Sequence, residues 1–297
     1  NKIVKFEAQY HGWSDEEKVT IDADSVEELG PIDNIYKIIN TKGQRIAAAD
    51  DIIVAPWNDL QALEKILKQQ SNDIAAVAME PFMCDSGPIL PQPGYLQGAK
   101  DLCEKYNVLL HFDEVITGFR MALGGAQQYY NVIPHIATFA KAITGGYPLA
   151  VVAGRKDIMD AGVHASGTFN GNPVSVAAAL ATIGILERPG VYEKFQKLGD
   201  RLCHGFEKLS KKHHIPLFCA AKGSIVELQL GTAQEATTFR DFLQKADIEK
   251  YQKLFHAAKA YGVRITPLRG RIYLTTAHTE EDIDKTIEIL DVVFSQI

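Results

Sequence analysis

Two ionisable residues stand at the ends of apolar runs in the middle of the chain, and their types could do chemistry together. Asp113 follows the branched apolar run 108–112, and Lys141 follows a second apolar run, 135–140. Short runs of this kind are typical of buried parallel strands, whose carboxyl ends meet at one ligand-binding edge of a sheet. The two residues are 28 positions apart, which leaves room for one strand–helix–strand crossover. The sequence therefore predicts that a carboxylate and an amine meet at such an edge.

A carboxylate and a primary amine at one site are what pyridoxal 5'-phosphate (PLP) chemistry requires. The lysine holds the aldehyde of the cofactor as a Schiff base and later moves protons, while the carboxylate keeps the pyridine nitrogen protonated. Gly145 and Gly146 allow the backbone to turn tightly after the lysine. Taken alone, the same acid and lysine also fit a turn cap and a solvated surface lysine, and their spacing does not decide between the two interpretations.

Two longer segments carry more information than the spacing. Asp113 lies within HFDEVITGFR and Lys141 lies within FAKAITGGYPLA. Together these segments resemble the paired signature of class III (fold type I) PLP-dependent aminotransferases, particularly their glutamate-1-semialdehyde aminomutase branch. The resemblance implies an α/β fold with a mostly parallel sheet in a large domain and a smaller C-terminal α+β domain. It also implies amino-group transfer through a Schiff base on Lys141, with Asp113 at the ring nitrogen of the cofactor.

Three further residues take cofactor-binding roles by the same resemblance. Tyr10 follows the strand-like run 3–6 and would stack on one face of the cofactor ring, and Val115 would pack against the other face. Thr168 would reach the cofactor phosphate of the neighbouring subunit, which implies a homodimer with shared active sites. Tyr10 also fits a surface aromatic residue, Val115 the end of any buried strand, and Thr168 an ordinary turn. His11 is expected to be a structural, hydrogen-bonding histidine.

Another group of candidates concerns the substrate. Glu80 ends the apolar run 73–79, and the resemblance places it close to the active site. Arg269 and Arg271 stand where several class III enzymes place an arginine that grips a substrate carboxylate through its planar fork. Local capping for Glu80 and surface ion pairing for the arginines are the alternatives. The partners implied are a small-molecule amino donor and a keto or aldehyde acceptor.

The elements that must position these residues fall into two regions. Residues 1–186 are expected to form the large cofactor-binding domain, and residues 187–297 the small α+β domain. The run 174–186 is mostly apolar and predicts a buried helix, while the run 150–154 predicts a strand that continues the α/β alternation. Thr279 and Asp282 predict a capping box at the start of the last helix.

Composition and charge restrict the class of partner. The 297 residues carry a net charge of −6, so the chain offers no basic field for nucleic acid or an anionic membrane. The four cysteines form no C-x-x-C pair and lie in or beside apolar segments. This pattern favours reduced thiols, a cytoplasmic location and no metal site. The longest apolar run is too short to span a bilayer.

One part of the family pattern has no counterpart here. The opening portion of the family contains a serine/glycine/threonine turn that holds the cofactor phosphate, and no glycine-rich phosphate loop replaces it. We therefore expect the large domain to be N-terminally incomplete. Two other functions stay open at this point: a PLP-dependent amino acid racemase or epimerase on the same fold, and a catalytically inert fragment or interaction subunit.

Overall fold

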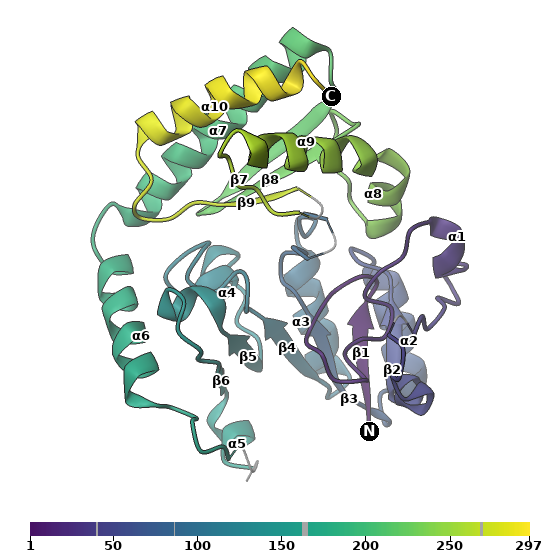
Figure 1. Cartoon of the computed structure of the whole chain (residues 1–297). Coiled ribbons are helices and arrows are strands. Elements are labelled where there is room, and N and C mark those ends of the chain that lie inside the picture. The colour runs from purple at the N-terminus through teal and green to yellow at the C-terminus, as the bar shows by residue number, and fades with distance from the viewer. Residues whose placement is uncertain (40, 86, 162–165, 268–269) are drawn as a thin grey trace. The chain divides into compact units, whose positions relative to one another are not determined.

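The computed structural model describes residues 1–39, 41–85, 87–161, 166–267 and 270–297, and its contacts divide the chain into two compact units (Figure 1). The first unit comprises Asn1–Met83 and Leu90–Glu187, and the second comprises Cys84–Ile89 and Arg188–Ile297. The sequence predicts one boundary, after residue 186, and gives no sign that the loop Cys84–Ile89 joins the second unit.

A six-stranded sheet forms the centre of the first unit, in the order β2-β1-β3-β4-β5-β6. Its strands are β1 (Lys2–Phe6), β2 (Ile52–Ala55), β3 (Ile74–Met79), β4 (Leu109–Asp113), β5 (Ile136–Phe139) and β6 (Val151–Gly154). All neighbours pair in parallel except β5 and β6, which are antiparallel. The mostly parallel sheet predicted from the short apolar runs is confirmed.

Strand β6 departs from the expected alternation, and the length of its connection explains why. Between Phe139 and Val151 the chain forms only the short 3-10 helix η2 (Lys141–Thr144). A parallel pairing needs a crossover of a dozen or more residues, usually through an α-helix. The connection is too short for that, so the chain turns back and β6 runs antiparallel to β5.

Helices and an aromatic cluster cover the sheet of the first unit. Helix α2 (Leu60–Gln70) begins at Asp59, whose side chain accepts a hydrogen bond from Ala62 N at 2.9 Å, and it packs against α3 (Tyr95–Lys105). Phe6, Trp57 and Tyr95 meet edge to face, with ring centroids 4.8 to 6.3 Å apart. The remaining helices of this unit are α1 (Val26–Leu29), η1 (Ile46–Asp51), α4 (Gly125–Tyr129), α5 (Lys156–Met159) and α6 (Pro173–Leu186).

Helix α6 is the clearest exception to the sequence-based expectations. The prediction of a buried helix is wrong for the single chain, because Val174 is 61% exposed and Leu180 is 68% exposed. The helix contacts η2 and buries Ser175, Ala179 and Leu186. Apolar side chains surround α6 on all sides, so packing along one face leaves the others uncovered.

The second unit is built on the antiparallel sheet β7 (Leu217–Lys222), β8 (Ile225–Leu230) and β9 (Arg271–Tyr273). Its helices are α7 (Val191–His213), α8 (Phe239–Lys245), α9 (Ile248–Ala260) and α10 (Glu280–Phe294). Helix α10 lies along α7 (Figure 1), and both oxygens of Asp284 on α10 accept hydrogen bonds from Arg201 on α7 at 2.6 Å. The predicted capping box of Thr279 and Asp282 is confirmed at the start of α10.

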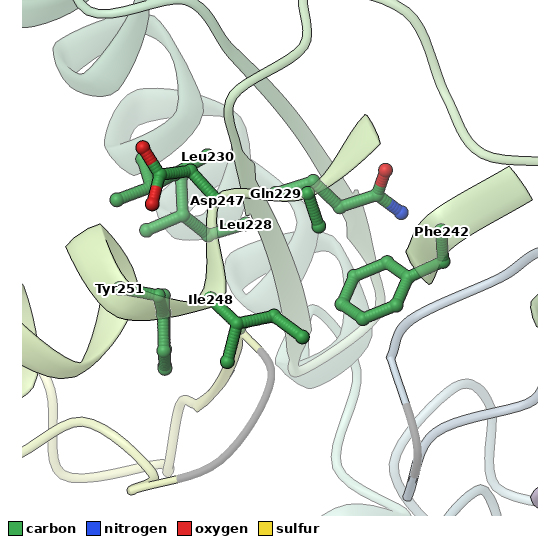
Figure 2. A pocket seen from close by; sticks show the side chains of 9 residues that line it. Leu228, Gln229, Leu230, Phe242, Asp247, Ile248 and Tyr251 are labelled. Carbon is green, nitrogen blue, oxygen red and sulfur yellow. The ribbon is translucent and has the colours of Figure 1, made fainter. Parts of the chain in front are cut away.

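An apolar pocket of the second unit lies between β8 and the helices α8 and α9 (Figure 2). Its three polar side chains are already engaged, and one of them, Tyr251, donates its hydroxyl to Thr266 O at 2.9 Å. Gln229 Nε2 donates to Pro88 O at 2.6 Å, and Asp247 Oδ1 accepts from Lys250 N at 2.8 Å as the cap of α9. None of the candidate site residues lines this pocket, so we assign it to the packing of the unit.

Candidate functional site

Four neighbouring parallel strands deliver candidate residues to one edge of the first sheet (Figure 1). Tyr10 follows β1, Glu80 follows β3, Asp113 ends β4 and Lys141 follows β5. Adjacent strands lie about 4.8 Å apart, and parallel strands end at the same edge. Asp113 pairs in register with Thr138 of β5, three residues before the lysine. The sheet topology therefore brings the acid and the lysine to the ends of adjacent strands.

The Asp113 carboxylate is buried, with 6% exposure, and both of its oxygens are engaged. Oδ2 lies 2.8 Å from His11 Nδ1, and Oδ1 accepts a hydrogen bond from Val115 N at 3.0 Å. Burial by itself raises the pKa of the carboxyl group. The hydrogen bond and the electrostatic interaction with His11, together with the hydrogen bond from the Val115 amide, lower this pKa below its usual value. Asp113 is therefore a buried anion at neutral pH.

His11 reaches Asp113 because Glu80 and Gln9 fix the turn that follows β1. Tyr10 N donates to Glu80 Oε1 at 3.2 Å, and Glu80 N donates to Gln9 Oε1 at 2.9 Å. Gln9 Nε2 also donates to the carbonyl oxygen of Glu80 at 3.4 Å. Glu80 was a candidate substrate group, but here its carboxylate binds the backbone of the turn. Tyr10 itself is 38% exposed.

Glu114, next to Asp113, has a role that the sequence reasoning missed. Its fully buried carboxylate accepts four hydrogen bonds, from Thr117 Oγ1, Ala126 N, Gln127 N and Gln127 Nε2, at 2.6 to 3.2 Å. Gly125 has φ +72°, and a Cβ there would lie 2.3 Å from Glu114 Oε2. Two signals in the sequence could have indicated this role, namely the second acid at the end of β4 and the glycine pair that includes Gly125. Glu114 thus ties the loop after β4 to the start of α4.

Lys141 begins η2 with a left-handed backbone, φ +50°, which is uncommon for a residue other than glycine. The side chain is exposed. Gly145 and Gly146 follow with φ +61° and +127°, and they form the tight turn that the sequence predicts. Because α6 packs on η2, that helix supports the segment that carries the lysine.

The other candidates occupy different surroundings. Val115 is partly buried directly after Asp113, and Thr168 is exposed shortly before α6, whose cap is Asn172. Arg271 belongs to the second unit, where its Nη1 lies 2.7 Å from Asp85 Oδ1, so this guanidinium is engaged in an ion pair. Arg269 lies outside the described residues.

The described ranges also bear on metal binding and on membrane crossing. Within them, no group of three or more histidine, cysteine, aspartate or glutamate side chains is arranged to hold a metal ion. In the same ranges no single helix combines the length and apolar composition needed to cross a membrane, and α6 and α7 reach that composition only when taken together.

Comparison with known proteins agrees with this arrangement. The family model described as Aminotransferase class-III matches residues 1–294. Glutamate-1-semialdehyde 2,1-aminomutase 2 of Brevibacillus brevis is 37% identical over 295 residues, which are 97% of this chain and 66% of the relative. The chain thus spans about two thirds of the length of the curated relative.

Solved structures share the fold. An omega-transaminase from Sphaerobacter thermophilus superposes with a TM-score of 0.88 at 26% identity, covering 99% of this chain and 68% of the other. A transaminase solved with PLP bound gives a TM-score of 0.84 at 21% identity, with 99% and 67% covered. With the family model matched over nearly the whole chain, the protein belongs to the class-III aminotransferase family.

Proposed function

We propose that this chain takes part in PLP-dependent amino-group transfer between an amino donor and a keto or aldehyde acceptor. The observation that carries the proposal is the pairing of a buried, ionised Asp113 with His11, at the end of the strand adjacent to the one that delivers Lys141. The family membership supports the same chemistry. The substrates and the assembly belong to this proposal, because the chain spans only 66% of the curated relative.

The residues present fit the cofactor. A pyridinium nitrogen needs an anion that stays ionised in a shielded place, and Asp113 is held in that state by His11 and Val115 N. His11 Nε2 is buried and has no hydrogen-bond partner within the described part of the chain, so the polar groups of this edge are not all satisfied by the protein. When bound, PLP supplies an aldehyde that captures amino groups and a ring that withdraws electrons from the substrate carbon.

The chain's own groups would then divide the work. Asp113 would hold the proton on the ring nitrogen, and His11 would keep Asp113 ionised and oriented. The amine of Lys141 would hold the cofactor and carry the proton at the substrate carbon. Tyr10 and Val115 would enclose the ring from its two faces.

A second copy of the chain is part of the proposal. Exposed apolar residues on and before α6 include Phe169, Val174, Val176 and Leu180, and burying such a surface stabilises an assembly. Thr168 lies just before the N-terminal end of α6. A second copy that covers this helix would bring Thr168 toward the active site of that copy, where it would bind the cofactor phosphate. Active sites of such a homodimer would be shared between its subunits.

Reduction with borohydride tests the proposal directly. The purified chain is mixed with PLP, treated with borohydride and digested, and we expect the reduced adduct on Lys141. Lys141→Ala should abolish the adduct, while Lys68→Ala, which removes an exposed lysine of α2, should leave it unchanged. A wild-type chain that takes up no PLP at any protein concentration would contradict the proposal and favour an inert subunit.

The type of reaction needs a second measurement. Incubation with an amino donor and a keto acid should give an exchanged pair of products, because only a transaminase moves the amino group between molecules. Inversion of the donor's stereocentre without exchange would instead identify a racemase or epimerase. A panel of amino acids, ω-amines and semialdehydes would then define the substrate class.

A further inference from the structure

Two thiols of the second unit meet at the contact between α7 and β7. Cys203 lies on α7 and Cys219 lies on β7, 16 positions apart, and their Sγ atoms are 2.7 Å from each other. Both cysteines are free. A disulfide bond measures about 2.0 Å between sulfur atoms. The two sulfurs therefore need to move by well under an ångström to become bonded.

The close approach of the two thiols follows from the packing of a glycine. Gly199 lies one helical turn before Cys203, and Ala221 lies two residues after Cys219 on the same face of the strand. A Cβ at Gly199 would lie only 2.6 Å from Ala221 Cβ. Because glycine has no side chain, α7 approaches β7 closely at this turn, and the next turn places Cys203 against Cys219.

The surroundings of Cys219 keep its thiol protonated. Burial raises the pKa of the Cys219 thiol well above its ordinary value, and the hydrogen bond to Cys203 and the nearby Glu227 and Glu207 act in the same direction. Cys203 is 8% exposed, while Cys219 is partly exposed. A reagent in solution therefore meets Cys219 first, and it must be small.

We propose that Cys203 and Cys219 form a dithiol site that a low-molecular-weight disulfide oxidises to an intramolecular disulfide, which fixes α7 to β7. The thiolate form of Cys219, which is present in a small fraction of the molecules, attacks the reagent, forms a mixed disulfide and releases one thiol of the reagent. The Cys203 sulfur then attacks Cys219 and releases the second thiol. The two protein thiols lose two electrons and two protons, and the reagent disulfide is reduced to two thiols.

The expected consequence is a more stable second unit. The bridge restricts the unfolded chain over the loop between the two cysteines, and this raises the midpoint of thermal unfolding by roughly 5–15 °C. The other two cysteines offer a matched comparison, since Cys84 and Cys103 are buried and neither is in a disulfide, and Cys103 lies on α3 in the first unit. The inference does not depend on the proposed amino-group transfer.

The test treats the purified chain with oxidised glutathione at mildly alkaline pH and measures intact mass, peptide linkage and thermal unfolding. We expect the loss of two hydrogen masses, a peptide that links Cys203 to Cys219, and the rise in unfolding midpoint. Cys103→Ser should behave in the same way. Cys203→Ser should stop at a glutathione adduct on Cys219 and should show no rise.

Several results would overturn the proposal. One is a wild-type chain whose four thiols all remain open to alkylation, after unfolding, at every oxidant concentration. Another is a bridge that joins any other pair of cysteines. If Cys203→Ser does not fold, Cys203→Ala takes its place, and the wild-type peptide map decides the question on its own.

Discussion

His11 Nδ1 lies 2.8 Å from Asp113 Oδ2, although the two residues are 102 positions apart in the chain. The turn after β1 and the end of β4 are brought together by the sheet, in which β3 separates the two strands. The interaction with His11 lowers the pKa of the Asp113 carboxyl group, which burial alone would raise, and so keeps the group ionised. The acid that the proposed chemistry requires therefore depends on a histidine from a distant part of the sequence.

Replacing this histidine should change the pH dependence of the proposed reaction. In His11→Phe the Asp113 carboxyl keeps its burial and loses its main partner, so its pKa should rise. Because the ionised form is lost as pH falls through this pKa, the acid limb of the transfer rate should move to higher pH. His204→Phe, which changes an exposed histidine, serves as the control. An unchanged acid limb in His11→Phe would show that His11 does not set the pH dependence of the reaction.

Glu114 should matter for stability and not for the proton chemistry. Glu114→Ala leaves the amides of Ala126 and Gln127 and the hydroxyl of Thr117 without their acceptor, so we expect a loss of about 2–4 kcal/mol in the free energy of unfolding. Hydrogen exchange at the two amides should become faster. Glu104→Ala, which removes an exposed partner of Lys100, should cost under about 0.5 kcal/mol. Equal losses in the two variants would contradict this assignment.

The exposed face of α6 gives a prediction about assembly. Leu180→Asp places a charge where the proposed second copy would cover an apolar side chain, so the variant should sediment as a monomer while the wild type sediments as a dimer. Val292→Asp on α10 changes an exposed apolar residue of the second unit and should keep the wild-type mass. A dimeric Leu180→Asp variant would place the interface elsewhere.

Lys5 predicts a pH dependence of stability. Its side chain is fully buried, Nζ donates to Glu17 O at 2.6 Å, and burial lowers its pKa from 10.5 to about 8, partly offset by Glu17 and Glu80. Between these two values the unfolded chain still holds a proton that the folded chain has released. The free energy of unfolding should therefore rise with pH from about 8 to about 10.5.

Lys5→Met should remove this rise and should increase the free energy of unfolding at neutral pH by about 1–3 kcal/mol, because no charge then needs to be buried. Lys68→Met, at an exposed position, should keep the wild-type slope. Chemical denaturation at a series of pH values measures both. A wild-type slope in Lys5→Met would show that another group titrates in this range.

The parts of the fold and of the candidate site that could be predicted from the sequence are those that depend on where strands end. Each apolar run that stops at an acid or a lysine is a local signal, and parallel pairing then collects the ends of such runs at one edge. This signal predicts Asp113 and Lys141 as site residues, and the resemblance predicts Tyr10 and Val115. By contrast, the link from His11 to Asp113 and the four donors around Glu114 depend on tertiary contacts that leave no periodic pattern.

Two misjudged elements have a simpler physical cause. The strand 150–154 was expected to continue the alternation, but its reversed direction is set by the length of the connection from β5 and not by its own residues. The apolar composition of α6 indicates that it must be covered, yet composition does not say by which chain. The direction of β6 and the covering of α6 both depend on neighbouring segments or chains, about which the sequence of one segment carries no information.

The loop Cys84–Ile89 means that neither unit is one continuous stretch of chain. The polypeptide leaves the first unit after Met83, supplies Asp85 to Arg271 and the Pro88 carbonyl to Gln229, and returns at Leu90. A protein cut at residue 187 would therefore separate the second unit from two of its own hydrogen-bonding groups. The half that begins at Arg188 would retain the largely buried guanidinium of Arg271 without the carboxylate of Asp85. Any shortened chain meant to isolate that half must therefore include the loop Cys84–Ile89 as well.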